Sequence, residues 1–353
     1  MLLGCLPLSA AAESASASAH SAGLRLSRSC ACQVSATRNA PPTYHAASKP
    51  SLADKAGPGN HGILPLPQQL NLNPHKVALG KRLFEDKQLS GNRSMACRNC
   101  HYLEQGGADG KPLSMAIDGQ PRSRNTPSIF NAGLLLLLNW EGQRRDLADV
   151  TEAIIKSKQG LASDWPRIVA RLNADPGYRD SFQKLYADSI QPNNVKDALV
   201  EYMRSLITPN SRFDRYLRGE RRALTQTEQE GYRLFKSYGC GSCHQGVAIG
   251  GNMVAPLGLF INDLAHAGTT LDEDPGKYAG TKNVRDKHVF RVPSLRNIAL
   301  TGPYMHTGTI NTLDDAVDLM GRLMLGRDIP EEHRRLLVAF LKTLTGEYQG
   351  KPL

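Results

Sequence analysis

Apolar residues recur at helical spacing in two separate stretches of the chain. Pro74 suits the first turn of a helix, and a broad apolar face follows it on residues 77–84. In the second stretch, Thr225 and Glu228 form a capping box ahead of an apolar face on residues 232–235. The pattern predicts a helix in each stretch.

The two stretches belong to a longer repeat. Arg82-Leu83-Phe84 recurs as Arg233-Leu234-Phe235, and the apolar pattern of residues 199–206 recurs at one constant offset in residues 337–344. The matched pairs are Leu199 with Leu337, Val200 with Val338, Tyr202 with Phe340, Met203 with Leu341 and Leu206 with Leu344. Such a repeat indicates a duplicated unit. Strand-like alternation is scarce, so we predict a mostly α fold with domains at 69–215 and 216–353.

Residues 1–68 have a different character. Ser, Ala, Pro and Gly dominate them without periodicity, which predicts a disordered leader. Residues 1–12 form a short apolar run that ends in alanines, like the end of a secretory signal, but lack its positive leading region. The longest later apolar run, Leu134 to Leu138, is too short to span a bilayer, so no transmembrane segment is expected.

Four of the seven cysteines fall into two Cys-x-x-Cys-His motifs. The motif residues are Cys97, Cys100 and His101 in the first copy and Cys240, Cys243 and His244 in the second. In c-type cytochromes the two thiols form thioethers to the porphyrin and the histidine binds the iron. A zinc or redox site is the alternative, but no second cysteine pair lies near either motif. The sequence therefore predicts two covalently bound haem c groups, one in each of two cytochrome c-like domains. Because haem c is attached outside the bacterial cytoplasm, the chain is expected to be exported to the periplasm.

The net charge of +10 and the pI near 9.3 do not indicate nucleic-acid binding. The Lys and Arg residues are scattered, and no basic stripe is interleaved with aromatic residues. Haem propionates need cationic partners, for which Arg291 and Arg296 are candidates. The remaining positive charge favours an acidic redox partner.

The two predicted haems differ in their candidate sixth ligand. Thr312 caps a helix in which Met320 shares an apolar face with neighbouring residues, so Met320 is either a ligand or part of the core. The matching region of the first half contains no methionine, and Met203 pairs with Leu341 in the repeat. The first haem is therefore expected to be open on one face.

A series of motifs in fixed order makes the chain similar to a known family over roughly residues 70–350. The motifs are Arg124-Asn125-Thr126-Pro127, Phe130-Asn131-Ala132, Trp140-Glu141-Gly142, Val292-Pro293-Ser294-Leu295-Arg296-Asn297 and Thr301-Gly302-Pro303-Tyr304-Met305-His306. With the two haem motifs, this series resembles the bacterial dihaem cytochrome c peroxidase and MauG family.

The resemblance assigns roles to several residues. His101 would hold the peroxidatic haem, and His244 with Met320 would ligate the electron-donating haem. Trp140 would relay electrons between them, although core packing is the ordinary role of a lone tryptophan. Asn125 and the carbonyls of Thr301 and Pro303 would form a calcium site, because oxygen ligands suit that hard cation.

The chain also departs from the family. Classical members carry a displaceable distal histidine sixteen residues after the proximal one, where this chain has Ile117. Their acid–base residues, ten and twenty residues after the tryptophan, align with Val150 and Gly160. Gln159 and Asp118 are alternative acid–base candidates, although exposed polar residues are common. MauG-type members carry Tyr where this chain has Met320.

Three functions remain open from the sequence. The leading one is a peroxidase that reduces hydrogen peroxide to water with electrons from a small cytochrome c or cupredoxin. The second is a MauG-like oxidase that modifies aromatic residues of a partner protein. The third is a dihaem electron carrier without catalysis. The sequence also allows a homodimer.

Overall fold

Regular structure in the protein is mainly helical. The computed structural model describes residues 62–259 and 274–353. The helices are α1 (Pro74–Phe84), α2 (Leu147–Lys156), α3 (Trp165–Ala174), α4 (Pro176–Gln183), α5 (Pro192–Ser205), α6 (Arg212–Leu217), α7 (Gln226–Ser237), α8 (Tyr278–Thr281), α9 (Leu313–Leu325) and α10 (Glu331–Lys342). Strand β1 (Val254–Pro256) pairs antiparallel with β2 (Val289–Arg291), and β3 (Glu347–Tyr348) with β4 (Lys351–Pro352). The mostly α prediction is confirmed. Within the described residues, no helix combines the length and apolarity needed to cross a membrane.

The predicted helix starts are confirmed by their caps. The Asn73 side chain accepts hydrogen bonds from the first amides of α1. Thr225 and Glu228 form the expected reciprocal capping box on α7, and the Thr312 side chain caps α9. Each cap satisfies amides that the helix itself leaves unpaired.

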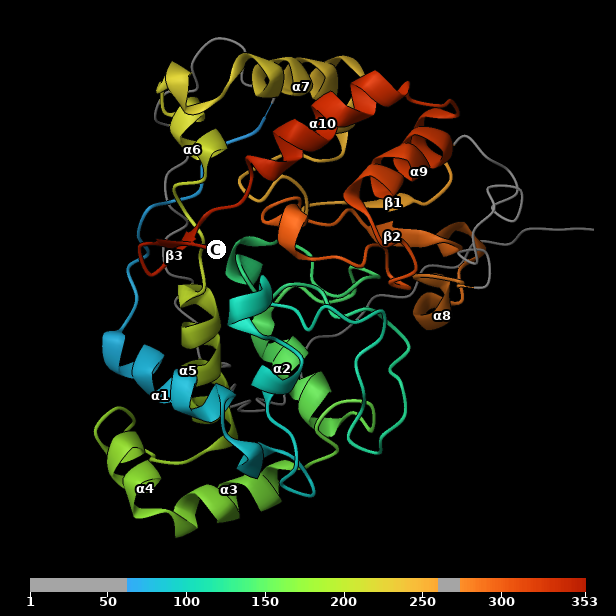
Figure 1. Ribbon diagram of the computed structural model, residues 1–353. Coiled ribbons are helices and arrows are strands. Elements are labelled where there is room, and N and C mark those ends of the chain that lie inside the picture. The colour runs from blue at the N-terminus through green and yellow to red at the C-terminus, as the bar shows by residue number, and fades with distance from the viewer. Residues whose placement is uncertain (1–61, 260–273) are drawn as a thin grey trace, which may run out of the picture. The chain divides into compact units, whose positions relative to one another are not determined.

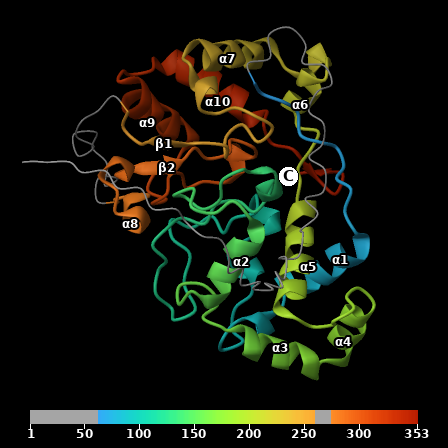
Figure 2. The same ribbon diagram turned by 180° about the vertical axis from the view of Figure 1, so that it is seen from behind.

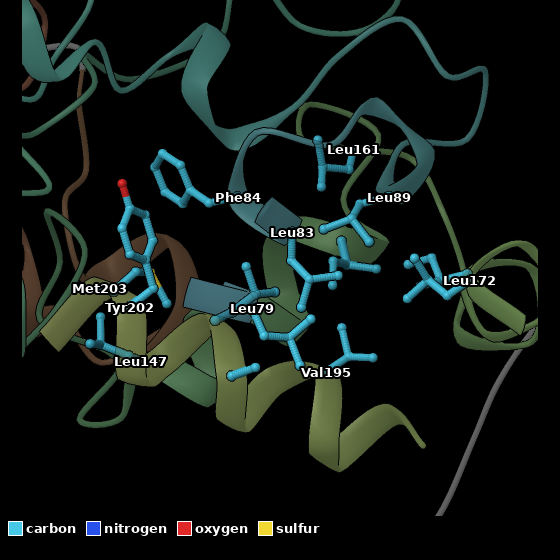
Figure 3. Close-up of a cluster of buried hydrophobic side chains, with 14 of the residues drawn as sticks. Leu79, Leu83, Phe84, Leu89, Leu147, Leu161, Leu172, Val195, Tyr202 and Met203 are labelled. Carbon is cyan, nitrogen blue, oxygen red and sulfur yellow. The ribbon is translucent and has the colours of Figure 1, made fainter. Parts of the chain in front are cut away.

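Two separate hydrophobic cores follow the two halves of the chain. Figures 1 and 2 show the helix pair at each core, α1 beside α5 and α7 beside α10. The first core contains side chains of all five helices from α1 to α5. Figure 3 shows Leu79 and Leu83 of α1 packed against Val195 of α5. The second core joins α6, α7, α9 and α10. Phe213 already belongs to the second core, so the change between cores comes slightly before the predicted boundary at residue 215. The division into two domains stays a prediction.

A glycine lets two helices approach closely in each half. A Cβ atom on Gly80 of α1 would lie 1.9 Å from the Ala198 carbonyl oxygen of α5. A Cβ on Gly231 of α7 would lie 2.0 Å from the Leu336 carbonyl oxygen of α10. Both distances are far below van der Waals contact, so only glycine fits. The repeat in the sequence is therefore present in the structure as two equivalent helix pairs.

A buried polar network joins the ends of the two repeats. The main-chain amides of Asn131 and Asn297 donate to the carbonyls of Leu206 and Leu344, respectively. The side chains of both asparagines hydrogen-bond to Thr208, at 2.8 Å from Asn131 Nδ2 and 3.0 Å from Asn297 Nδ2 to Thr208 Oγ1. One threonine thus connects equivalent positions of the two halves.

The predicted leader is wrong at its last residues. Residues 62–68 pack on the second half, where the side chains of Ile63 and Leu66 are buried. The Leu66 amide donates to Asp214 Oδ1 at 3.0 Å. Two well-spaced apolar side chains are enough to fill the core there, although the composition around them resembles a linker. The rest of the predicted leader and the signal-like run, residues 1–61, lie outside the described residues.

Replacing Gly80 with Ala tests the close helix contact. Helix propensity alone favours Ala over Gly by about 1 kcal/mol. Because the added Cβ would overlap Ala198, we expect Gly80→Ala instead to lower the free energy of unfolding by about 2 kcal/mol. Denaturant unfolding of the haem-loaded protein measures the change. Lys81→Ala, at an exposed position of α1, serves as the control and should change stability by less than about 0.5 kcal/mol. A stabilised Gly80→Ala variant would contradict this packing.

Candidate functional site

The two Cys-x-x-Cys-His motifs adopt the same local structure. Each first cysteine opens a short 3-10 turn that ends at the second cysteine. The histidine amide closes the turn by donating to the first cysteine's carbonyl, at 3.1 Å from His101 to Cys97 and 2.9 Å from His244 to Cys240. All four motif cysteines are free thiols. Each motif therefore offers two thiols and one imidazole from a single turn, as haem c attachment requires.

The His101 ring is fixed through its Nδ1 atom. Nδ1 lies 3.1 Å from the Gly107 carbonyl oxygen, and because a carbonyl can only accept, Nδ1 carries the proton. Burial lowers the pKa of His101 to about 4, so the ring is neutral. Nε2 then holds a lone pair that is free to bind iron, in the arrangement common to metal-binding histidines whose other nitrogen donates to a carbonyl. Gly107 has φ +79°, and a Cβ there would lie 2.8 Å from Ser128 Oγ.

The His244 ring is partly buried and neutral. Burial lowers its pKa to about 4, against the opposing effect of the Ile249 and Pro293 carbonyls. Its Nδ1 is buried and forms no well-aligned hydrogen bond within the described part of the chain. A neutral imidazole can bind iron through its other nitrogen, Nε2. The ligand role of His244 stays a prediction.

Met320 lies on α9 but apart from the hydrophobic clusters around it. Val317 belongs to the second core, whereas Leu319 and Leu323 form a smaller cluster that Met324 joins. Met320 is partly buried and is in none of the clusters of the described residues. The core interpretation is therefore weaker for Met320 than for its neighbours, and its role as an iron ligand stays a prediction.

Arg291 and Arg296 are both buried but differ in how their charges are balanced. Arg296 Nη1 lies 2.8 Å from Asp214 Oδ1, and both side chains are almost fully buried. Arg291 Nε donates to the Asn139 carbonyl at 2.8 Å, and among the described residues its guanidinium forms no ion pair. Burial lowers the pKa of Arg291 to about 10, opposed by Glu141. Arg291 is thus the better candidate for a propionate, because Asp214 already neutralises Arg296.

Trp140 is anchored by a hydrogen bond from its indole. Nε1 donates to the Asn125 carbonyl oxygen at 2.8 Å. The Trp140 ring meets the His306 ring edge-on, with centroids 6.1 Å apart, and His306 stacks on Phe290 at 4.1 Å. Trp140 therefore contacts residues from both halves of the chain, as the relay role requires.

The predicted calcium ligands come from two segments that meet. The Asn125 side-chain amide donates to main-chain carbonyls of residues 111–112, and its main-chain amide donates to the His306 carbonyl at 2.8 Å. Thr301 and Pro303 lie in the same loop as His306. The structure thus brings Asn125 to the loop that carries the other two residues, and the calcium site stays a prediction.

A charged network beside Trp140 was not predicted from the sequence. Arg124 binds Glu141 through Nε at 3.1 Å and Asp274 through Nη2 at 2.7 Å. Asp274 Oδ2 also lies 3.0 Å from His306 Nε2, although the two groups are not aligned for a good hydrogen bond. Burial raises the pKa of Asp274, but His306, the Gly276 amide and Arg124 together outweigh it and lower the pKa. Asp274 belongs to no motif, so no sequence signal identified it.

Both predicted acid–base candidates are exposed. Gln159 Oε1 accepts a hydrogen bond from the Ser123 hydroxyl at 3.1 Å, and Asp118 Oδ1 accepts one from the Gln120 amide within a turn. Ile117, beside Asp118, is partly buried. Within the described residues, neither candidate forms a hydrogen bond with Trp140 or His101, so their catalytic roles stay predictions.

Gly160 aligns with the second of the family's acid–base residues, and its position cannot accept a side chain. A Cβ on Gly160 would lie 2.2 Å from the Ile154 carbonyl oxygen of α2. Val150, at the other aligned position, packs against the first core. The absence of an acid at residue 160 is therefore built into the backbone of this segment.

Comparisons with known proteins agree with this geometry. The family model described as di-haem cytochrome c peroxidase matches residues 74–222. The cytochrome c551 peroxidase of Nitrosomonas europaea is 36% identical over 82% of this chain and 85% of that protein. The cytochrome c peroxidase Ccp of Escherichia coli is 39% identical over 82% of this chain, which spans 62% of that longer protein. The crystal structure of a MauG-like protein associated with microbial copper homeostasis is similar with a TM-score of 0.70 and 29% identity, covering 81% of this chain and 93% of that one.

Removing one pair of motif thiols tests haem attachment. In a bacterial host that attaches haem c, we expect the wild-type chain to keep two haems after denaturation and the Cys97→Ser, Cys100→Ser double variant to keep one. Haem staining of denaturing gels and haem-to-protein ratios measure this. Cys32→Ser, outside both motifs, should keep two. A double variant that still held two haems covalently would argue against thioether attachment at this motif.

The Asp274 carboxylate should stabilise the fold in a pH-dependent way. Because its folded pKa lies below the ordinary carboxyl value, the stability it contributes is complete above that value and is lost as the pH falls through the folded pKa. We expect Asp274→Asn to lower the free energy of unfolding by about 2 kcal/mol at pH 7 and to weaken its acid dependence. Denaturant unfolding between pH 3 and 7 measures both, with exposed Asp180→Asn as the control. Parallel curves for Asp274→Asn and the wild type would contradict this role.

Proposed function

The chain belongs to the di-haem cytochrome c peroxidase family, and from this premise we propose that it reduces hydrogen peroxide to water at the haem held by His101. The observation that supports this most is the inequality of the two motifs. His244 has a candidate partner in Met320, whereas the first half has isoleucine at residue 117 and no matching methionine. An iron with a free position can bind peroxide, and one with both positions filled transfers electrons.

The residues of this chain hold and orient the two haems. The Gly107 carbonyl keeps the proton of His101 on Nδ1 and so directs Nε2 to the iron. Arg291 would bind a propionate. When bound there, haem c would supply a redox-active iron that can exchange electrons with peroxide. In the net reaction, hydrogen peroxide, two protons and two electrons give two water molecules.

Electrons and protons reach the first site by different routes. We assign electron transfer between the halves to Trp140, which contacts Asn125 and His306. Because residue 160 cannot hold an acid, we assign proton delivery from solvent to Asp118, in the turn after Ile117, with Gln159 as the other polar candidate. The calcium site at Asn125, Thr301 and Pro303 would hold the two segments together.

The donor would be a small cytochrome c or cupredoxin in the periplasm. A net charge of +10 favours an acidic partner through faster association. Covalent haem attachment outside the cytoplasm supports this location.

A MauG-like oxidation of a partner protein is the second candidate. Ile117 and Gly160 both depart from the peroxidase pattern, and the solved structure of a MauG-like protein is similar over most of this chain. In that case oxidising equivalents would leave the protein for an aromatic residue of the partner. Mass spectrometry of a co-purified partner after peroxide treatment would show a cross-link or inserted oxygen, and an unmodified partner would count against it.

Steady-state oxidation of a reduced cytochrome c by hydrogen peroxide tests the peroxidase directly. We expect turnover without prior reduction of the enzyme, because no histidine at residue 117 blocks the first haem. The resting ferric spectrum should show one high-spin haem that changes when peroxide is added. An enzyme with both haems low-spin and unreactive would contradict the proposal.

Ile117→His tests the open position on the first iron by supplying a ligand for it. The new imidazole should bind the first iron, convert the resting haem to low spin and slow its reaction with peroxide by about tenfold or more. Met115→His adds the same side chain at an exposed position of the same loop and should react like the wild type. A high-spin, fully reactive Ile117→His enzyme would show that residue 117 does not face the iron.

A further inference from the structure

Aromatic side chains lead from His101 away from Trp140. The rings of His101 and Phe84 have centroids 6.4 Å apart. Phe84 meets Tyr202 edge-to-face at 5.3 Å, and Figure 3 shows these two rings side by side at one end of the first core. Tyr202, on α5, is only 2% exposed. A buried phenol therefore lies one ring away from the proximal ligand of the first haem.

The Tyr202 hydroxyl points to a second tyrosine at the surface. The hydroxyl is buried and has no well-aligned hydrogen bond among the described residues. Burial and the nearby Tyr348 hydroxyl raise the pKa of Tyr202, so the phenol keeps its proton. Both tyrosines line a cavity of about 500 Å³ between α1, α5 and the β3–β4 hairpin. Tyr348 is partly buried and packs on Phe130 at 5.0 Å.

The second half of the chain has the same packing without the hydroxyl. Phe340 occupies the position in the repeat that Tyr202 has in the first half. It packs on Phe235 with centroids 5.2 Å apart, as Tyr202 packs on Phe84. Phenylalanine therefore satisfies the helix contact, and packing does not explain the hydroxyl of Tyr202. At this position of the repeat, the phenol is present in the half whose haem is proposed to react with peroxide.

We propose that Tyr202 and Tyr348 form a tyrosine relay that carries oxidising equivalents from the His101 side of the first haem to the surface cavity. This inference rests on the proposed peroxidase function. Phe84 is the medium between His101 and Tyr202 and is not itself oxidised.

The relay step balances in electrons and protons. Hydrogen peroxide takes two electrons and two protons to become water, which leaves the haem protein oxidised by two electrons. Without a reduced donor, the Tyr348 phenol supplies one of these two electrons to the haem through Tyr202. Its hydroxyl proton goes to water in the cavity, and a neutral phenoxyl radical remains at Tyr348. The relay thus moves one oxidising equivalent away from the haem when the donor supplies no electrons.

Electron paramagnetic resonance of the haem-loaded protein tests the relay. After peroxide is added without donor, the wild type should show a tyrosyl radical, and a nitroso spin trap should label the peptide that contains Tyr348. Tyr202→Phe, which copies the residue of the second half, should lose both. Tyr348→Phe should keep the radical at Tyr202 and lose the label. Tyr232→Phe, a buried tyrosine that packs on Phe340, is the matched control and should behave as the wild type.

The outcomes separate the relay from the proposed function. A Tyr202→Phe protein with the wild-type radical and label overturns the relay, and so does a wild type that reacts with peroxide but forms no tyrosyl radical. In both cases the peroxidase proposal stands. A wild type whose optical spectrum does not respond to peroxide overturns the peroxidase proposal and the relay together.

Discussion

The fold depends on main-chain contact between two helices, made once in each half of the chain. Gly80 and Gly231 have no side chain, so α1 and α7 lie directly against the carbonyls of α5 and α10. This contact fixes how each helix is rotated against its partner, and therefore where the aromatic rings on that helix lie. In the first half it places Phe84 between Tyr202 and the His101 ring. The aromatic contacts of Phe84 and the packing of the helices in both cores depend on these two contacts.

On this common frame the two halves differ around their motif histidines. Both histidines are partly buried and neutral, and within the described residues the Nδ1 of His101 has a well-aligned hydrogen bond that the Nδ1 of His244 lacks. The second half supplies Met320, and the first half supplies Ile117. A duplicated unit can thus separate the site that reacts from the site that delivers electrons without a change of fold.

Much of the fold and part of the site could be predicted from the sequence. Helical periodicity, Pro74 in the first turn of α1 and the caps at Thr225 and Thr312 predicted the helix starts, because these signals are local. The pairing of Arg296 with Asp214 and the contacts of Asp274 could not be predicted, because they join residues far apart in the chain.

Burial of residues 62–68 was missed for a related reason. Composition averages over a window, whereas burial of this segment involves only two apolar side chains, Ile63 in the second core and Leu66. The exposure of Gln159 and Asp118 likewise depends on turns whose orientation the sequence does not reveal.

Thr208 gives the duplication a further meaning. Its hydroxyl contacts Asn131 of one repeat and Asn297 of the other, so equivalent parts of the two copies meet at a single buried side chain. The chain thus resembles two fused copies of one unit that share a buried contact at this residue. Because the contact is buried, we expect changes in the length of exposed loops to leave this junction between the two copies unaltered.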